Sequence, residues 1–236
     1  MLFYSLVFLL VSCSGGGTEK KASTDSTATD TTTAVVTPKV TTVTTPQNML
    51  VVTHKVANYA KWKASYDEHD SARLANGIHN YVIGRGIKDS NMIMVALKVD
   101  DTAKAKAFAK DPGLKKAMQK GGVIGTPTVV LNTMTFQDTV SMSTDLRART
   151  TFTVKDWAAW VKAYEEARQE KLDNGITLRA YGHKSDDDKK VVLVTAITDT
   201  AKAFAYYKSD LIKKRRAESG VIGEPDRFLY RVVAHY

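Results

Sequence analysis

The sequence predicts an α+β fold in which two tandem ferredoxin-like (β-α-β-β-α-β) repeats pack sheet to sheet as one intrachain barrel. The first observation behind this prediction is a duplication. The segment 122–127 (GVIGTP) returns at 220–225 (GVIGEP), a shift of 98 residues, and the same shift pairs Trp62 with Trp160. Matched spacing over about 75 residues indicates an internal repeat. The fold is therefore predicted for one repeat and then for the pair.

The second observation is a strand that is apolar on both faces. In the segment 93–97 (IMVAL) both alternating sets of side chains are hydrophobic. A strand of this kind needs cover on both sides of its sheet. The helices of one repeat can cover one face only. We therefore expect the second repeat to cover the other face, as a partner subunit does in a homodimer.

The first repeat is expected over residues 49–138, in the order of the split β-α-β unit. Trp62 and Tyr66 fall on one face at about 100° per residue, which predicts a helix over 59–74. Asp101 is a good N-cap for a second helix. The expected elements are strand 49–56, helix 59–74, strands 81–86 and 92–99, a helix from 101 that restarts at 112, and strand 128–136.

The second repeat is expected over residues 146–236 on the same plan, after a polar joining segment at 137–145. The repeated glycine segment at 122–127 lacks the Lys-Ser/Thr pair of a phosphate-binding loop, and no strand precedes it. We therefore expect it to be a tight turn between helix and strand, present twice because both repeats need it.

The start of the chain resembles a bacterial lipoprotein. The segment 10–13 (LVSC) follows an apolar run and resembles a lipobox, in which signal peptidase cuts before the cysteine that is then acylated, for example with palmitate. No Lys or Arg precedes the run, which departs from the secretory pattern. We expect a signal peptide at 1–12 and acylation of Cys13, which would hold the protein in a lipid bilayer of the cell envelope. The expected location is the outer membrane, facing the periplasm or the surface.

A tether is expected to follow the anchor. Residues 13–48 are rich in Ser, Thr, Gly, Ala and Lys and offer almost nothing to bury. Such a segment cannot offset its ordering entropy and is expected to be disordered.

Composition excludes few classes of function. The chain of 236 residues carries a net charge of +9, but its Lys and Arg residues are scattered. The one basic run, 213–216, is expected on a solvated helix face, with an anionic lipid surface as the alternative. The sequence shows no nucleic-acid-binding signature. It shows no metal-ligand spacing either, so neither nucleic acid nor a metal is an expected partner.

One set of residues resembles a known superfamily. The pattern consists of Trp62, Tyr66, His69, Arg73, Gly77 and Ile78, then Asp100–Asp101 opening an Ala-rich helix, then 122–127. It is similar to the dimeric α+β-barrel superfamily, and most of all to small antibiotic-biosynthesis-monooxygenase-like proteins. The resemblance covers both repeats. It implies the barrel fold but no single chemistry, because the superfamily includes cofactor-independent monooxygenases, haem-degrading enzymes, isomerases and proteins that are not enzymes.

The candidate ligand-binding residues lie on the first helix of the first repeat: Tyr59, Trp62, Tyr66, His69 and Arg73. The superfamily usually holds ligands between helix and sheet, and aromatic walls with a few polar groups suit a small molecule. The alternative is that the aromatic residues are core, because the second repeat keeps them. His69 and Arg73 differ in this respect: they face Ala167 and Lys171, and only an arginine has a planar fork for a carboxylate.

The sequence therefore predicts a membrane-anchored lipoprotein, monomeric with pseudo-twofold symmetry, that binds a small and largely apolar molecule without a cofactor. One alternative is an enzyme, either a cofactor-independent monooxygenase or a haem-handling protein. Another is a structural or interaction module of the envelope. The sequence leaves open whether the protein is an enzyme and names no catalytic residue.

Overall fold

The same order of elements occurs twice in the chain, as the duplication predicts. The computed structural model describes residues 41–236. The predicted signal peptide, Cys13 and most of the predicted tether lie outside the described residues. Among residues 41–236 no helix is long and apolar enough to cross a membrane.

The first repeat has four strands, and each predicted helix is a pair of short helices. Its elements are β2 (Gln47–Val56), α1 (Tyr59–Glu68), α2 (Asp70–Ala75), β3 (Ile78–Gly86), β4 (Met92–Val99), α3 (Thr102–Phe108), α4 (Pro112–Lys120) and β5 (Val123–Asp138). Capping residues fix the helix starts. The Asp101 carboxylate accepts hydrogen bonds from the backbone N–H groups of Ala103 and Lys104, and Asp111 caps α4 just before Pro112. Both starts confirm the sequence prediction.

The second repeat follows the same plan. Its elements are β6 (Leu146–Val154), α5 (Trp157–Glu166), α6 (Arg168–Asp173), β7 (Ile176–Lys184), β8 (Asp187–Ile197), α7 (Thr200–Lys208), α8 (Asp210–Glu218) and β9 (Val221–His235). Asp156 and Asp199 cap α5 and α7.

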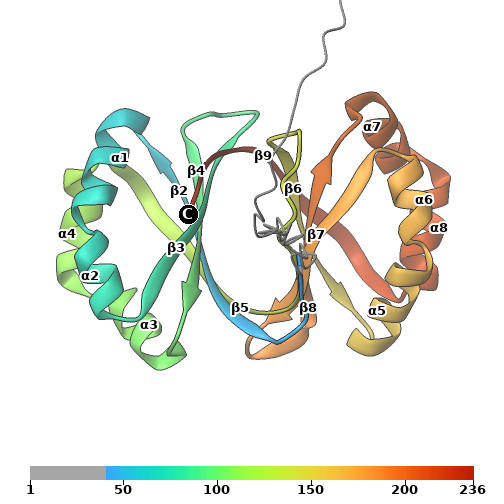
Figure 1. The fold of residues 1–236 in the computed structure, drawn as a ribbon, viewed down its shortest axis with the longest axis horizontal. Coiled ribbons are helices and arrows are strands. Elements are labelled where there is room, and N and C mark those ends of the chain that lie inside the picture. Colours follow the sequence, from blue (N-terminus) through green and yellow to red (C-terminus); the bar gives the residue numbers. More distant parts are fainter. Residues whose placement is uncertain (1–40) are drawn as a thin grey trace, which may run out of the picture. The chain divides into compact units, whose positions relative to one another are not determined.

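The two sheets join into one ring. The strand order is β1-β5-β2-β4-β3-β9-β6-β8-β7, in which β1 is the two-residue strand Thr42–Val43, and β7 pairs back to β5. The two joints between repeats are antiparallel, with Gly86 opposite Tyr230 and Asn132 opposite Lys184. The eight long strands therefore close a barrel, with the helices of each repeat outside it (Figure 1). Closure removes the edges that a single repeat would expose.

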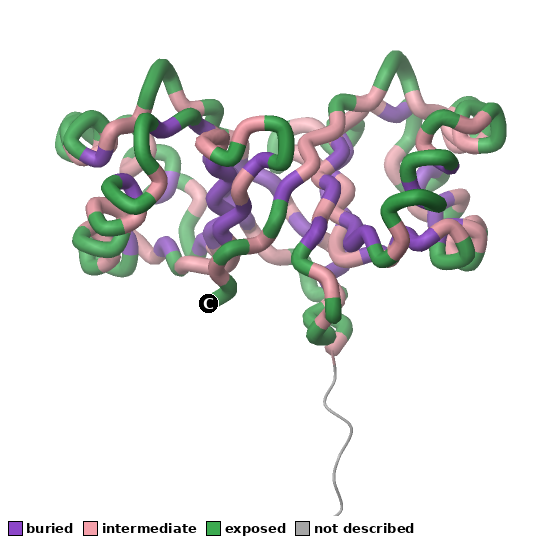
Figure 2. Tube along the Cα trace, turned by 90° about the horizontal axis from the view of Figure 1, so that it is seen from above, coloured by how far each residue is buried: buried purple, intermediate pink, exposed green. Residues whose placement is uncertain are grey.

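Both faces of the central strands are buried, as the sequence predicts. In β2, Leu50 and Val52 face the helices of the first repeat, whereas Met49 and Val51 face the barrel interior. All four are at most 7% exposed. Figure 2 shows buried positions gathered in the middle, where the two sheets meet, and exposed positions on the outer helices.

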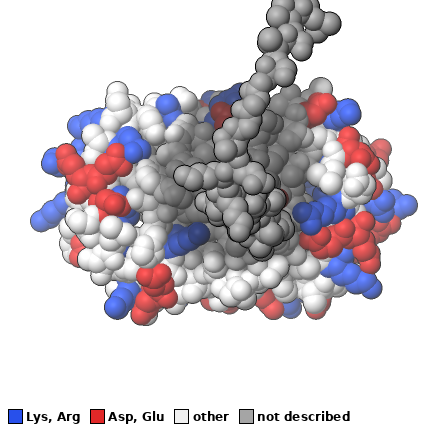
Figure 3. Space-filling view, in the orientation of Figure 1, with Lys and Arg blue, Asp and Glu red and all other residues white. Residues whose placement is uncertain are grey.

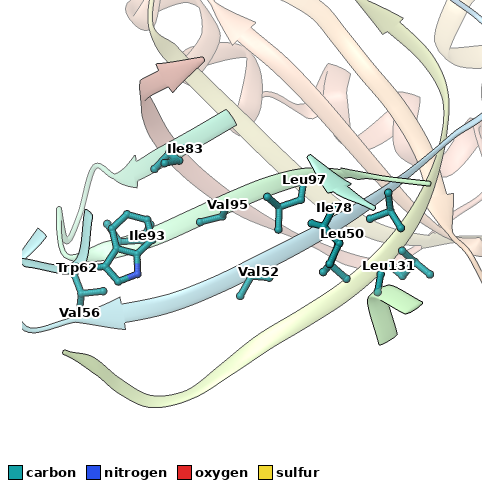
Figure 4. Close-up of a cluster of buried hydrophobic side chains, with 12 residues drawn as sticks. Leu50, Val52, Val56, Trp62, Ile78, Ile83, Ile93, Val95, Leu97 and Leu131 are labelled. Carbon is teal, nitrogen blue, oxygen red and sulfur yellow. The ribbon is translucent and has the colours of Figure 1, made fainter. Parts of the chain in front are cut away.

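Trp62 joins the first helix layer to the sheet. It lies over Ile93 and Val56 in Figure 4 and is only 4% exposed. Trp160 is equally buried in the second repeat, at 3%. Trp62 is thus part of the core of its repeat, as the alternative interpretation of the aromatic face predicts.

Only the start of the repeated glycine segment is the turn that the sequence predicts: Gly122, with φ +82°, lies in the turn between α4 and β5, and its counterpart Gly220 has φ +74°. β5 already begins at Val123, and Val123 and Ile124 pair with β2. The register then shifts between Ile124 and Thr128, so the Gly-Thr-Pro segment forms a bulge inside the closing strand. Gly125 has φ +73° and its counterpart Gly223 has φ +71°, a backbone region that favours glycine.

Two further expectations are corrected. The helix predicted over 59–74 breaks at His69 into α1 and α2, and the second repeat breaks at Ala167 with nearly the same dihedral angles. Because the break recurs with different residues, it belongs to the fold and not to the histidine.

The end of the predicted tether is also ordered: β1 (Thr42–Val43) pairs with Asp138 and Gln137, and its β-branched side chains suit a short edge strand.

Candidate functional site: two cavities between helices and sheet

Each repeat has a cavity between its helices and its sheet. The first-repeat cavity has a volume of about 80 Å³, and the second-repeat cavity about 390 Å³. The two occupy matching places, because most of their lining residues correspond at the 98-residue shift. The chain therefore offers two versions of one site, which differ by substitution alone.

Four of the five predicted site residues line the first-repeat cavity: Trp62, Tyr66, His69 and Arg73. Tyr59 does not line it. Its ring packs on Trp62, with the centroids 5.8 Å apart, and the guanidinium of Arg85 lies over it at 4.2 Å. The structure thus brings the helix face together and leaves Tyr59 at its outer end.

Arg73 is buried, and its fork is already engaged. Its two terminal nitrogens donate to the carbonyl of Tyr66 at 2.8 Å and to the carboxylate of Asp70 at 3.1 Å. The guanidinium also lies 3.7 Å from the centroid of the Tyr66 ring. Lys171 repeats this arrangement over Tyr164 at 4.5 Å. A cation over this tyrosine is therefore a feature of both repeats, and the two terminal nitrogens of Arg73 already have partners within the chain.

The histidines of the first-repeat cavity differ from each other. Nδ1 of His69 lies 2.8 Å from the carbonyl of Ser65, which fixes the ring at the helix break. His54 is not among the site residues that the sequence predicts. In the structure it is 5% exposed, lines the cavity and has no hydrogen-bond partner at either ring nitrogen among the described residues. Burial lowers the pKa of His54 to about 4, so it is neutral at physiological pH.

The second-repeat cavity was missed by the sequence analysis. Phe152, Trp160, Tyr164 and Leu193 form its apolar wall. Its polar groups come from strands and from the last helices: Thr150, Thr195, Arg227, Tyr206, Tyr207, Arg215 and Arg216. The predicted site rests on one helix face of each repeat, whereas these polar residues lie on other elements.

The 98-residue shift shows which of these positions are polar in the second repeat alone, but it does not show that they share a cavity. At the 98-residue shift the polar lining residues replace apolar ones: Thr150 replaces Val52, Thr195 replaces Leu97, Tyr206 replaces Phe108, Arg216 replaces Met118 and Arg227 replaces Val129. The first-repeat cavity is thus filled by apolar side chains, while the second is larger and polar on one side.

Arg227 is the central cation of the second-repeat cavity. Its guanidinium stacks on the Tyr207 ring at 3.6 Å from the centroid, and its Nε donates a long hydrogen bond of 3.4 Å to Thr150 Oγ1. Burial lowers the pKa of Arg227 and raises that of Tyr207. The hydroxyl of Thr195 is buried nearby, beside the Tyr207 hydroxyl, and makes no hydrogen bond of ordinary geometry among residues 41–236.

Several titratable groups in or beside this cavity are committed to partners. Glu170 accepts hydrogen bonds from Arg215 at 2.8 Å and from the Tyr206 hydroxyl at 2.7 Å. The Arg215 hydrogen bond holds the pKa of Glu170 below its usual range. Lys171 donates from Nζ to the carbonyl of Ala167 at 3.1 Å. None of these groups is an unengaged acid or base.

Neither cavity suits haem, and no metal cluster is found. Among residues 41–236 no group of three or more His, Cys, Asp or Glu side chains could hold a metal ion. Haem iron needs an axial ligand such as His, Cys, Met or Tyr. No His, Cys or Met lines the second-repeat cavity. Each of its three tyrosines already has a partner, because Tyr206 is bonded to Glu170, Tyr207 lies under Arg227 and Tyr164 lies under Lys171. The first-repeat cavity has histidines but a volume of only about 80 Å³.

Comparison with known proteins supports the fold. No family model and no curated relative matches the chain. Three similar solved structures are a candidate monooxygenase from Fusobacterium nucleatum (12% identity, TM-score 0.55), a mutant chlorite dismutase from Candidatus Nitrospira defluvii (9%, 0.55) and an anthrone oxidase-like protein (13%, 0.53). Each match covers 80% of this chain, and 93%, 92% and 92% of those chains respectively. The chain is thus structurally similar to dimeric α+β-barrel proteins, as its sequence predicts. Likeness at such low identity says nothing of activity.

Proposed function

We propose that this protein binds a small, largely apolar molecule in the second-repeat cavity. The observation that carries the proposal is the cavity itself. Its volume of about 390 Å³ lies within the range of about 300–1,000 Å³ that is typical of small-molecule sites. Its aromatic and aliphatic wall faces a few polar groups, which is the usual composition of such a site.

The pKa values and hydrogen-bond partners of the polar groups favour a binding function over a catalytic one. A general acid or base needs a pKa near the working pH and access to its substrate. In the second-repeat cavity, burial raises the pKa of Tyr206 and Tyr207 further from neutrality, and Glu170 is engaged by Arg215. A cofactor-independent monooxygenase stays an alternative, and its mark would be oxygen consumption that depends on an added substrate.

The experiment uses N-phenyl-1-naphthylamine, an uncharged aromatic dye that fluoresces when it leaves water. Ala163 lines the second-repeat cavity, and Ser65 lines the first at the matching position. The Ala163→Phe variant fills the larger cavity and should abolish binding, whereas Ser65→Phe should leave it unchanged. The reverse result would place the ligand at the predicted residues Trp62, Tyr66 and His69. Absence of dye binding to the intact protein would refute the proposal.

We also propose that the protein works at a membrane, held there by acylated Cys13. The lipobox-like segment before Cys13 supports this proposal. Several acyl chains would anchor the protein firmly, because each buried methylene contributes about 0.8 kcal/mol. Replacing Cys13 with Ala should leave an unprocessed precursor that incorporates no labelled palmitate. Palmitate that still enters the C13A variant would rule out acylation at this residue.

The distribution of charge on the face shown in Figure 3 does not favour nucleic-acid binding. In Figure 3, Lys and Arg side chains are interspersed with Asp and Glu over the helices of both repeats. A nucleic-acid-binding protein instead gathers its basic residues on one face. An interaction module without a ligand would bind neither dye nor oxygen and would retain a partner in pull-down experiments.

A further inference from the structure

Arg227 in the second-repeat cavity has no anionic partner among residues 41–236. Arg227 lines the cavity and makes no ion pair with any carboxylate of residues 41–236. Its contacts in the described chain are the ring of Tyr207 and the long hydrogen bond to Thr150. A partly buried guanidinium with five donors and so few acceptors is costly unless something else completes its hydrogen bonds.

The acidic residues around the cavity cannot fill this role where they stand. Glu166 is exposed and lies 4.0 Å from Lys162, and Glu218 lies 3.3 Å from Arg215. Glu224 lies 3.6 Å from Arg216 with its side chain 95% exposed. Each of these carboxylates therefore already has a cation nearby, whereas Arg227 and Lys171 are lining cations without an ion pair among residues 41–236; Lys171 donates to the Ala167 carbonyl instead.

The first repeat shows that the fold does not need these polar groups. Val129, Val52 and Leu97 stand where Arg227, Thr150 and Thr195 stand in the second repeat. Leu97 is buried in the core of the first repeat, so the position accepts a plain hydrophobic side chain. Burying Arg227, Thr150 and Thr195 therefore lowers stability relative to the hydrophobic residues that the first repeat has at these positions. Such a loss of stability is typical of a functional site.

We propose that the ligand of the second-repeat cavity is an apolar, ring-bearing molecule with one anionic group, a carboxylate or sulfonate, that pairs with Arg227. This inference rests on the binding function proposed above. The guanidinium fork matches the two oxygens of such a group. The buried hydroxyl of Thr195, which lies beside the Tyr207 hydroxyl and makes no hydrogen bond of ordinary geometry among residues 41–236, can serve as a further donor. The ring of the ligand lies against the wall of Phe152 and Trp160.

The test compares two dyes that differ by the anionic group alone. 8-Anilino-1-naphthalenesulfonate has the aromatic skeleton of N-phenyl-1-naphthylamine with one sulfonate added. We expect the intact protein to bind the sulfonate dye at least about tenfold more tightly, the effect of one charge-assisted hydrogen bond. The Arg227→Val variant, which copies Val129, should lose that preference and bind the two dyes about equally tightly. Thr150→Val, which copies Val52, should reduce the preference in part.

A matched arginine controls for net charge. Arg85 stacks on Tyr59 much as Arg227 stacks on Tyr207, but it lies outside both cavities. Arg85→Val should leave both affinities unchanged, and Ala163→Phe should remove both.

If the neutral dye binds and the sulfonate dye binds no better, the anionic ligand is ruled out while the binding function stands. If the sulfonate dye binds equally well to R227V, it does not pair with Arg227 and the inference is overturned. If neither dye binds, both proposals fail.

Discussion

His54 packs on Trp62 with the geometry that Phe152 has on Trp160. The ring centroids are 5.4 Å apart in both pairs, and the interplanar angles are 54° and 58°. His54 and Phe152 correspond at the 98-residue shift. A phenyl ring therefore fits this position in the same fold. The imidazole of the first repeat instead buries two ring nitrogens that have no hydrogen-bond partner among the described residues.

The first prediction is that His54→Phe stabilises the protein. The substitution removes two unpaired polar atoms and fills part of the first-repeat cavity. An unsatisfied buried polar group costs about 1–3 kcal/mol, so the free energy of unfolding at pH 7 should rise by about that amount. Urea denaturation measures it, and Phe152→His should be destabilising as the reverse control. If H54F loses stability, buried water must satisfy the imidazole.

The second prediction concerns acid. Burial lowers the pKa of His54 to about 4 from its ordinary value of 6.5. Between these values the unfolded chain binds a proton that the folded chain refuses, so stability falls as pH drops from about 6.5 to 4. The shift corresponds to about 3 kcal/mol. Paired carboxylates also contribute to acid unfolding, so the quantity to measure is the difference between the intact protein and H54F. That difference should be largest near pH 4 and constant above pH 7. A difference that does not change with pH would show that His54 keeps its ordinary pKa.

Much of the fold could be predicted because the same pattern of residues occurs in both repeats. Trp62 and Trp160 fix the register of the repeats, and Asp101 marks a helix start by its own side-chain chemistry. The alternation in 93–97 indicates that both faces are covered. These signals are local, or they are repeated at a fixed distance.

The barrel joints and the larger cavity could not be predicted in the same way. The pairing of Gly86 with Tyr230 joins strands from opposite repeats, and no local pattern specifies such a register. The cavity depends on the volumes of side chains from β6, β8, β9 and two helices at once. Arg227 and Thr195 each resemble ordinary strand residues until the structure places them on one cavity wall.

The third prediction tests the bulge inside β5. Gly125 has φ +73°, and a Cβ added there would meet nothing within 4 Å. Gly125→Ala should therefore cost about 1–2 kcal/mol through the backbone alone, since an L-residue is strained in this region. Gly223→Ala in the second repeat should cost a similar amount, because its φ is +71° and its surroundings are equally open. Denaturant midpoints of the two variants should match. An unchanged midpoint in both would show that the segment relaxes to another conformation.

The last prediction is that the first repeat does not fold alone as a monomer. A fragment of residues 41–138 loses β9 from the edge of β3 and β7 from β5. It also exposes Met49, Val51 and Met94, which the intact barrel buries in its interior. Open edges and an apolar face of this kind drive association. Light scattering should therefore show a dimer or aggregate for the fragment and a monomer for the intact protein. Adding the fragment 140–236 should convert the first fragment into a one-to-one complex, because the second repeat supplies the missing strands. A stable monomer that unfolds cooperatively would mean that the ring is not what holds each repeat together.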